Sequence, residues 1–342
     1  MASRNIVGLD LGSKFIKAVQ LTETSGQFKI TEFGITEVSS QVSVTDAVSE
    51  LFNRKNFKTK RVVSSVSGRF VFVRYISMPV MTDEELVNAA KYELGKYIPV
   101  EVDEVLHDSQ KLEELPAQEG QEPEMRVLLV AAKRTFIDEH VGVLEAAGLQ
   151  PSVVDVDSFA LGNAYELAGT ISPQAVAPGK LVALVDIGAS KTNINIMTDT
   201  ISYFTREFYK GGDDLTDAVS KKLSLEAREA EMLKRNPGGE LDKVQDCISG
   251  VAEDICHDVN ISVDYFENQY DRKVEEVYIT GGASNTPGFQ ETLERTVQKP
   301  VNRWNPTQHL ELDLPRDSAQ ELQDAPLQAA IALGLASRIR RD

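Results

Sequence analysis

The chain has 342 residues, more than one hydrophobic core usually organises, so two domains are expected. Its 53 acidic and 36 basic residues give a formal net charge of -17, which disfavours binding to nucleic acids and to anionic lipid surfaces. The two cysteines, Cys247 and Cys256, are too few for a disulfide framework and lack zinc-site spacing, so we interpret them as ordinary thiols of a reducing compartment.

The first segment, VGLDLGSKFIKAV at residues 7–19, places an acid and a glycine between two strand patterns. We expect no signal peptide, because the residues before this segment lack an apolar stretch. Asp10 ends a buried strand, which costs free energy unless a cation or hydrogen bonds compensate its charge. Gly12 lets the backbone approach a ligand, and the amides of Ser13 and Lys14 can point at an anion. Lys14 and Lys17 are candidates to neutralise phosphate, although a single turn of this kind is more often a structural hairpin.

Two common nucleotide-binding motifs are excluded by this segment and by the rest of the chain. GLDLGSK separates its glycines by three residues where the P-loop requires four, and G-x-G-x-x-G does not occur in the sequence. A P-loop also continues into a helix, whereas KFIKAVQL alternates as a strand does.

The next elements are strands in FKITEFGITEV, KRVVSSVSG and FVFVRYISMP, with a helix in VTDAVSELFNRKN between the first two. A helix is predicted in MTDEELVNAAKYELGKYIP, with Thr82 and Glu85 as a capping box and Pro99 as its end. The apolar side of this helix carries Leu86, Ala89, Ala90, Leu94 and Tyr97. Strands in EVDEVLHDSQKL and EMRVLLVAAKR then flank EELPAQEGQEP, which we interpret as an exposed hairpin loop.

The middle of the chain contains a helix from Thr135 to Gly148, the strand SVVDVD and the helix SFALGNAYEL. Asp155 and Asp157 are the acids of this segment, and capping of a helix that begins at Ser158 is their favoured role. Residues 169–180, GTISPQAVAPGK, are rich in Gly, Pro and Ala and mark the predicted domain junction.

After the junction, KLVALVDIGASKTNINI repeats the pattern of the first hairpin. Aligning Asp10 with Asp186 and Gly12 with Gly188 gives a repeat separated by about half the chain, which predicts two similar domains. Two facing turns of this kind could hold a polyphosphate from both sides, with Asp10 and Asp186 binding Mg²⁺ through water.

Two further segments fit the same ligand. YKGGDDLTDAVSKKL places Gly211 and Gly212 before a helix, where exposed amides could bind phosphate, although a plain glycine turn is equally consistent. In AREAEMLKR, Glu231 and Lys234 share one helix face and could contact a ribose or an adenine edge. Considered alone, the pair of Glu231 and Lys234 indicates a surface salt bridge.

The C-terminal part contributes one more candidate site and an apolar helix. EEVYITGGASNTPGF opens a buried strand into Gly281, Gly282 and Ala283, where a flat base or ribose could lie against the backbone. In LQAAIALGLASRIRR the apolar residues surround the helix axis, which favours a helix buried inside a domain over one lying on a membrane.

In their order, VGLDLGSKFIKAV, VVDVDSFALGNAY, LVDIGASKTNINI, YKGGDDLT, EAEMLK and VYITGGAS resemble the five-part nucleotide-binding pattern of the actin-like ATPase superfamily. FVFVRYISMPVMTDEELVNAAKYELGKYIPVEVDEV resembles, more narrowly, the insert of the PilM family of type IV pilus assembly proteins, which is similar to the cell-division protein FtsA. The resemblance covers nearly the whole chain. It implies an α/β, actin-like ATPase fold with two domains around a cleft for ATP and Mg²⁺, a five-stranded sheet in each large subdomain, and an FtsA-like small subdomain inserted in domain one.

The resemblance also implies domain boundaries. Domain one would be residues 1–171, with a large subdomain of 1–77 and 151–171 and the inserted small subdomain at 78–150. Domain two would be residues 172–342, with a large subdomain of 181–212 and 273–342 and a small helical subdomain at 213–272.

Site residues are implied in the same way. The first phosphate loop would be Asp10, Gly12, Ser13 and Lys14, and the second Asp186, Gly188, Ala189 and Ser190. Adenosine would contact Gly281, Gly282 and Ala283, with Glu231 and Lys234 beside it. The water-orienting group of relatives lies near Asp155 and Asp157, to which no catalytic role is assigned, so we expect a slow ATPase or a nucleotide-gated binding module.

The resemblance implies a partner, the cytoplasmic N-terminal peptide of the membrane protein PilN, bound in a groove between the insert and the adjacent large subdomain. The expected walls are the strand of Val71, Val73 and Tyr75 and the helix face of Tyr97, with core packing as the alternative role of each. The protein would be cytoplasmic and recruited by PilN to the inner membrane. Two alternatives stay open: a sugar-type kinase of the same superfamily, and an FtsA-like membrane-tethered filament protein.

Overall fold

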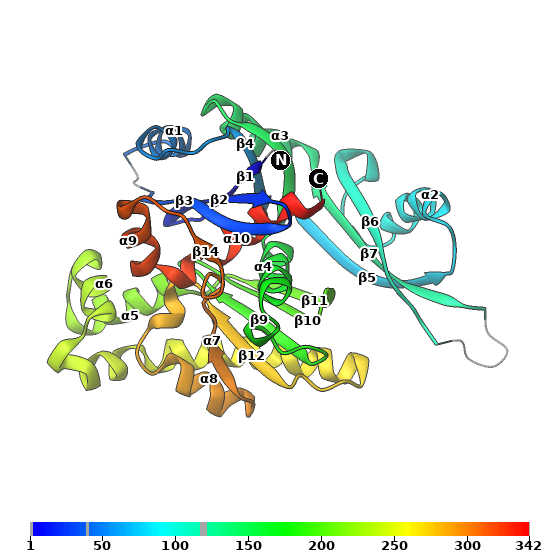
Figure 1. The fold of residues 1–342 in the computed structure, drawn as a ribbon. Coiled ribbons are helices and arrows are strands. Elements are labelled where there is room, and N and C mark those ends of the chain that lie inside the picture. Colours follow the sequence, from blue (N-terminus) through cyan, green and yellow to red (C-terminus); the bar gives the residue numbers. More distant parts are fainter. Residues whose placement is uncertain (1–2, 39–40, 117–121, 342) are drawn as a thin grey trace. The chain divides into compact units, whose positions relative to one another are not determined.

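The computed structural model describes residues 3–38, 41–116 and 122–341 (Figure 1). The chain divides into two units, a main unit of Met1–Ser65 and Ala147–Asp342 and an insert of Val66–Ala146. The insert begins earlier than the expected residue 78, because the strand Val71–Pro79 pairs within it. The further division into four subdomains stays a prediction.

The first sheet of the main unit grows from the alternating N-terminal segments. Among the described residues it has six strands, in the order β14-β3-β2-β1-β4-β8. Strands β1, β2 and β3 form an antiparallel meander, and β4 lies parallel to β1. The expectation of five strands missed β14, a two-residue strand from the C-terminal part that pairs with β3. The bounds are β1 Arg4–Leu11, β2 Phe15–Thr24, β3 Gln27–Glu37, β4 Arg61–Val66, β8 Gln150–Val156 and β14 Glu311–Leu312.

The second sheet repeats this arrangement with later segments of the chain. Its described strands number five, in the order β11-β10-β9-β12-β13. Again two hairpins come first in sequence, and β12 then lies parallel to β9. The repeat that the sequence predicts is therefore present in the topology of both sheets. The bounds are β9 Leu181–Ile187, β10 Thr192–Thr198, β11 Ile201–Phe208, β12 Glu276–Thr280 and β13 Val301–Arg303.

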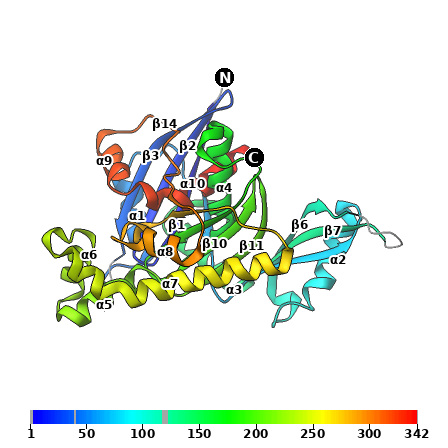
Figure 2. The same cartoon turned by 90° about the horizontal axis from the view of Figure 1, so that it is seen from below.

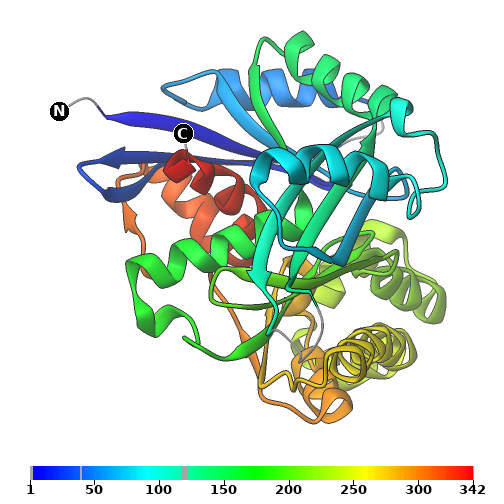
Figure 3. The same ribbon diagram turned by 90° about the vertical axis from the view of Figure 1, so that its right-hand side faces the viewer.

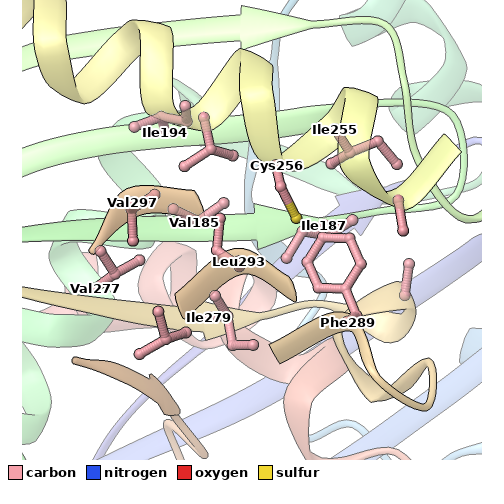
Figure 4. Close-up of a cluster of buried hydrophobic side chains, with 14 of the residues drawn as sticks. Val185, Ile187, Ile194, Ile255, Cys256, Val277, Ile279, Phe289, Leu293 and Val297 are labelled. Atoms are coloured by element: carbon pink, nitrogen blue, oxygen red, sulfur yellow. The ribbon is translucent and has the colours of Figure 1, made fainter. Parts of the chain in front are cut away.

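Helices cover both faces of the second sheet. On one face, side chains of β9 and β12 such as Val185 and Ile279 form a core with Cys256 of α7 and Leu293 of α8 (Figure 4). Figure 2 shows the long helix α7 running along this face. On the other face, α4 and α10 share a core with the first sheet. Both cysteines are buried and free, as interpreted.

The main unit contains these helices: α1 Val44–Arg54, α4 Asp157–Ile171, α5 Gly212–Leu223, α6 Ala227–Arg235, α7 Leu241–Tyr270, α8 Phe289–Val297, α9 Arg316–Asp324 and α10 Ala330–Ala336. Short 3-10 helices are η2 Pro173–Ala175, η3 Gly238–Glu240, η4 Gly282–Asn285, η5 Pro326–Ala329 and η6 Ser337–Arg341. The segment predicted as helical, residues 213–272, consists of α5, α6, η3 and α7 with their connections.

Helix α10 is buried on all sides, which confirms the prediction made from its apolar pattern. It packs so closely on β1 that a Cβ atom at Gly8 would lie only 1.9 Å from the carbonyl oxygen of Ala332. A larger residue at this position would push the helix off the sheet. Among the described residues, helices that combine the length and the apolar composition needed to cross a membrane are absent.

The insert is an antiparallel sheet with a helix on one face (Figure 3). Its described strands follow the order β5-β7-β6, and α2 covers one face with Leu86, Ala90 and Leu94. The capping box of Thr82 and Glu85 is present as predicted. Residues 117–121 of the predicted hairpin loop lie outside the described residues. The bounds are β5 Val71–Pro79, α2 Asp83–Leu94, η1 Val102–Glu104, β6 Val105–Glu114, β7 Glu124–Lys133 and α3 Arg134–Ala146.

Helix α2 ends earlier than predicted. Its last residue is Leu94, five positions before Pro99, and Gly95 is its C-cap. The expectation that Tyr97 lies on the helix face was therefore wrong, since Tyr97 lies in the turn that follows and is 40% exposed.

Candidate functional site

The first turn joins β1 to β2 and carries Gly12, Ser13 and Lys14. In the hairpin register Asp10 lies opposite Lys17, and Lys17 Nζ is 2.6 Å from Asp10 Oδ2. Asp10 is only 7% exposed, so burial raises the pKa of its carboxyl group, while the Lys17 ammonium opposes this shift. The cost of the buried acid at the end of this strand is thus met by a lysine of the next strand.

The second turn joins β9 to β10 and repeats this geometry with different chemistry. Asp186 lies opposite Asn193, whose Nδ2 donates a hydrogen bond of 3.4 Å to Asp186 Oδ2. Burial raises the pKa of Asp186 to about 6, and the nearby Asp10 carboxylate adds to the shift while Lys17 opposes it. The turn is closed by the Gly188 amide, which donates to the Lys191 carbonyl over 2.9 Å.

The two turns meet each other directly. Ser190 Oγ donates a hydrogen bond of 2.8 Å to Ser13 Oγ, so the tips of the two predicted phosphate loops touch. The neighbouring Lys14 Nζ lies 3.6 Å from Asp213 Oδ1 of α5 and 3.5 Å from Glu231 Oε2 of α6. The first turn therefore contacts the second turn and two helices from the later half of the chain.

Gly211 and Gly212 lie beside the second turn but are not exposed. The Gly211 amide donates to Asp214 Oδ2 over 2.8 Å, and the Gly212 amide donates to the Gly188 carbonyl over 2.9 Å. The next amide, of Asp213, donates to the Ala189 carbonyl over 2.8 Å. The expectation of exposed amides at this helix start was wrong, because carbonyl and carboxylate groups of the protein already accept from them. They hold α5 against the second turn, and a phosphate contact by these glycines stays a prediction.

Glu231 and Lys234 form a buried ion pair, so the surface salt bridge indicated by the sequence alone was wrong. Lys234 is 4% exposed, and its Nζ donates to Glu231 Oε2 at 2.8 Å, Thr216 Oγ1 at 2.7 Å and the Gly212 carbonyl at 2.8 Å. Burial opposes ionisation of Glu231, but Lys234 and Thr216 outweigh it and lower the pKa of Glu231 to about 2. The pair fixes α6 to the start of α5, next to the two turns.

Gly281, Gly282 and Ala283 follow β12 and come close to the second turn. Gly281 has φ of 84°, and a Cβ atom there would lie 2.5 Å from the Ile187 carbonyl oxygen and 2.6 Å from Asp186 Oδ1. Only glycine fits both this conformation and this approach to the carboxylate. A methyl group at Gly212 would lie 3.1 Å from the Cβ atom of Ala283 and 3.7 Å from Lys234 Nζ, so two of the predicted adenosine residues lie next to Gly212.

Asp155 and Asp157 have different surroundings, and neither caps α4 as the sequence favoured. The helix begins at Asp157, with Val156 as N-cap, and within the described chain that cap has no side-chain hydrogen bond. Asp155 accepts from the Val156 amide at 2.8 Å and from Asn163 Nδ2 at 3.2 Å. Asp157 Oδ2 instead accepts from Lys191 Nζ at 2.7 Å. The helix starts one residue before the predicted Ser158, so Asp157 lies in its first turn, where it pairs with Lys191.

Sequence reasoning missed Lys191. It lies between the carboxylates of Asp157, at 2.7 Å, and Glu207, at 3.3 Å. Burial opposes its protonation, but the two carboxylates outweigh burial and raise the pKa of Lys191. A signal was available in the repeat, because the position equivalent to Lys191 in the first turn is the apolar Phe15.

The residues predicted to form a peptide groove lie on two faces of the insert sheet. Phe72 and Ile76 of β5 pack with α2, so the alternating Val71, Val73 and Tyr75 point to the opposite face. Tyr97 is on the α2 side, where its carbonyl accepts from Arg74 Nη2 over 3.2 Å. The structure therefore does not bring Tyr97 together with the other three, because strand alternation separates them. Strand β5 is at an edge of the described sheet.

Five strands of the first sheet follow the same order as the second sheet, and the turns that follow Asp10 and Asp186 meet at one point. This arrangement defines an actin-like ATPase fold. MreB5 of Spiroplasma citri bound to ADP shares this fold, with a TM-score of 0.52 and 10% identity over 99% of this chain and 97% of that one. The family model "Type IV pilus assembly protein PilM" matches residues 8–340. The chain belongs to this PilM family.

Two further relatives agree with this assignment. The structure of a PilM-PilN type IV pilus biogenesis complex matches with a TM-score of 0.82 and 26% identity, over 97% of this chain and 98% of that one. Cell division protein FtsA of Streptococcus pneumoniae is 21% identical over an alignment 355 positions long. The alignment covers 88% of this chain and 75% of the relative. The family match does not favour the kinase alternative or the filament alternative.

Proposed function

We propose that this protein is a component of the type IV pilus assembly machinery that binds the N-terminal peptide of PilN and holds ATP as a structural or regulatory ligand. The observation that carries the proposal is the match over 97% of the chain to a PilM-PilN complex. PilN would recruit the protein to the inner membrane. This localisation rests on the same match, since the relative is described as a complex with PilN.

The nucleotide would lie between the two turns, with its phosphates at Gly12, Ser13, Gly188, Ala189 and Ser190. The geometry supports this placement because the turn tips already meet at one point. Glu231, Lys234 and the Gly281–Ala283 segment would line the adenosine side, although all three polar hydrogens of Lys234 already have acceptors. Lys14 and Lys17 supply positive charge near the phosphates.

The acids fit Mg²⁺ unequally. Groups of three or more His, Cys, Asp or Glu side chains placed to hold a metal ion are absent from the described residues. The Asp10 carboxylate is paired with Lys17, whereas Asp186 has the neutral Asn193 as its hydrogen-bond partner. We therefore assign the larger share of the water-mediated contact to Asp186. When bound, the ion would neutralise phosphate charge.

Calorimetry with ATP, with and without Mg²⁺, tests the nucleotide part. We expect ATP to bind and Mg²⁺ to raise the affinity in the unmodified protein. In Asp186→Asn the gain from Mg²⁺ should be lost, while in Asp10→Asn part of it should remain. Absence of ATP binding in the unmodified protein would refute the proposal, and equal effects of the two variants would refute the unequal roles of the acids.

The peptide would pair with the edge of β5 and place apolar side chains against Val71, Val73 and Tyr75. Extended peptides commonly add to an exposed sheet edge in this way, with alternate side chains giving specificity. Acidic residues outnumber basic ones two to one in the insert, residues 66–146. This charge favours a peptide that carries Lys or Arg.

Two matched tyrosine truncations test which face binds the peptide. Tyr75→Ala should weaken binding of a fluorescent PilN peptide about tenfold, because aromatic side chains at such interfaces contribute 1 kcal/mol or more. Tyr97→Ala, on the opposite face, should leave the affinity within about twofold. Anisotropy titrations measure both variants, and circular dichroism checks that each is folded. Weaker binding in Tyr97→Ala alone would move the site to the α2 face.

A further inference from the structure

Lys191 of the second turn reaches an acid from the first half of the chain. Its Nζ is 2.7 Å from Oδ2 of Asp157, at the start of α4, and 3.3 Å from Glu207 Oε2 of β11. All three side chains are mostly buried, with exposed fractions of 24% for Lys191, 12% for Asp157 and 19% for Glu207. An ammonium at this distance occupies one carboxylate oxygen and makes the group less basic.

Asp157 lies beside the second turn, because its Oδ2 is 2.7 Å from Nζ of Lys191 and the Lys191 carbonyl accepts from the Gly188 amide within that turn. Its negative charge also contributes to the raised pKa of both Asp10 and Asp186, the acids that precede the two turns. Asp155, the other acid of this segment, is turned away, since it accepts from Val156 and Asn163 and lies 3.6 Å from Arg338 Nη1. Asp157 is therefore the acid of this segment that lies next to the proposed phosphate position.

We propose that Lys191 restrains hydrolysis by holding Asp157 in an ion pair, so that Asp157 does not orient a water molecule toward the terminal phosphate of bound ATP. The inference rests on the proposed nucleotide binding. Hydrolysis forms a bond from the water oxygen to the γ-phosphorus and breaks the bond from that phosphorus to its bridging oxygen. The electron pair leaves with ADP, and the proton of the water passes to the released phosphate.

Orienting the water requires a carboxylate oxygen that accepts its hydrogen bond in line with the bond that breaks. With Lys191 in place, Asp157 Oδ2 accepts from an ammonium instead. Lys191 acts through Asp157 and is thus a positioning residue. Because hydrolysis is restrained, bound ATP persists and can act as a regulatory ligand.

The test replaces Lys191 by methionine, which keeps the length of the side chain without its charge. In Lys191→Met we expect single-turnover hydrolysis of ATP to rise about a hundredfold, the lower end of the range for one well-placed acid–base group. Affinity for ADP with aluminium fluoride, a mimic of the transferring phosphoryl group, should rise by a similar factor relative to ADP alone. Lys191→Gln serves as a second variant if the methionine variant does not fold.

Two controls separate this role from a structural one. Glu207→Gln removes the other partner of Lys191 and leaves the contact with Asp157, so its hydrolysis rate should stay near that of the unmodified protein. The double variant Lys191→Met with Asp157→Asn should lose the gain in hydrolysis and the gain in aluminium fluoride affinity. A gain that persists in the double variant would overturn the inference.

Two other results would also overturn it while leaving the proposed function standing. One is unchanged hydrolysis and unchanged aluminium fluoride affinity in a Lys191→Met protein that binds ATP. The other is weaker ATP binding without faster hydrolysis, which would make Lys191 a phosphate ligand. Failure of the unmodified protein to bind ATP would overturn the proposed function and this inference together.

Discussion

The hairpins β1–β2 and β9–β10 have the same backbone plan and different electrostatics. In each, the acid is paired with the residue seven positions later, Lys17 for Asp10 and Asn193 for Asp186. The first acid has an ammonium 2.6 Å away, and the second has an amide at 3.4 Å. The repeat therefore preserves where the acid lies, while the cross-strand residue differs: an ammonium contacts Asp10, and a neutral amide donates to Asp186.

The lysines of the two turns also differ, and each is directed at the other half of the chain. Lys14 of the first turn lies near Asp213 and Glu231 of α5 and α6. Lys191 of the second turn pairs with Asp157 at the start of α4. Each turn is therefore tied by a lysine to helices of the opposite half, in addition to the hydrogen bond between the two turn serines.

The largest effect on stability should come from replacing the cross-strand partners of the two acids, Lys17 and Asn193, by the same apolar residue. Lys17→Met leaves the buried Asp10 carboxylate without its cation, which should lower the free energy of unfolding at pH 7 by about 3 kcal/mol. The matched variant Asn193→Met removes one long hydrogen bond and should cost about 1 kcal/mol. Urea denaturation measures both. Equal losses would contradict the difference between the two hairpins.

A smaller effect should come from the glycine that supports the second hairpin alone. Gly281→Ala forces a methyl group to within 2.6 Å of Asp186 Oδ1 at φ of 84°, so we expect a loss of about 2 kcal/mol. Gly282→Ala is the control, because its methyl group would lie 3.4 Å from the flexible side chain of Gln328. The control should change stability by about 0.5 kcal/mol or less. Thermal unfolding that ranks the two variants in the opposite order would exclude the close approach at Gly281.

The smallest effect depends on pH. The pKa of Asp186 is about 6 in the folded protein, against about 3.9 in an unfolded chain. The folded state therefore holds this proton more tightly, so its contribution to stability is present below pH 4 and is lost as the pH rises to about 6. Asp186→Asn removes this dependence and should be more stable than the unmodified protein at pH 7 by about 1 to 2 kcal/mol.

Urea titrations at pH 4 and pH 7 measure this effect. The two proteins should differ little at pH 4, where the carboxyl group is protonated in the folded state. A stability difference that is the same at both pH values would show that the Asp186 carboxyl group is not held in its neutral form.

Features encoded by neighbouring residues could be predicted from the sequence. The turn after Asp10, its copy after Asp186, the capping box at Thr82 and the buried helix α10 each depend on residues a few positions apart. The two sheets followed from the repeat of the hairpins. Strand β14 was missed because two residues cannot display a period.

Features that depend on distant partners could not be predicted. Lys234 is buried because Thr216 and the Gly212 carbonyl, on another helix, accept its hydrogen bonds. Asp157 pairs with Lys191 across 34 positions of sequence, which local capping preferences do not register. The amides of Gly212 and Asp213, at the start of α5, donate to carbonyl groups of the second turn. In each case tertiary structure supplied the partner that decided the role of the residue.

The contact between β1 and α10 has a consequence for biosynthesis. Strand β1 ends at Leu11, and the helix that covers it begins at Ala330, so the first strand is made long before its packing partner. At ribosomal rates the interval is roughly 15 to 65 s. During this time the apolar face of the N-terminal meander has no α10 to bury it, so the nascent chain exposes a surface that the folded protein covers.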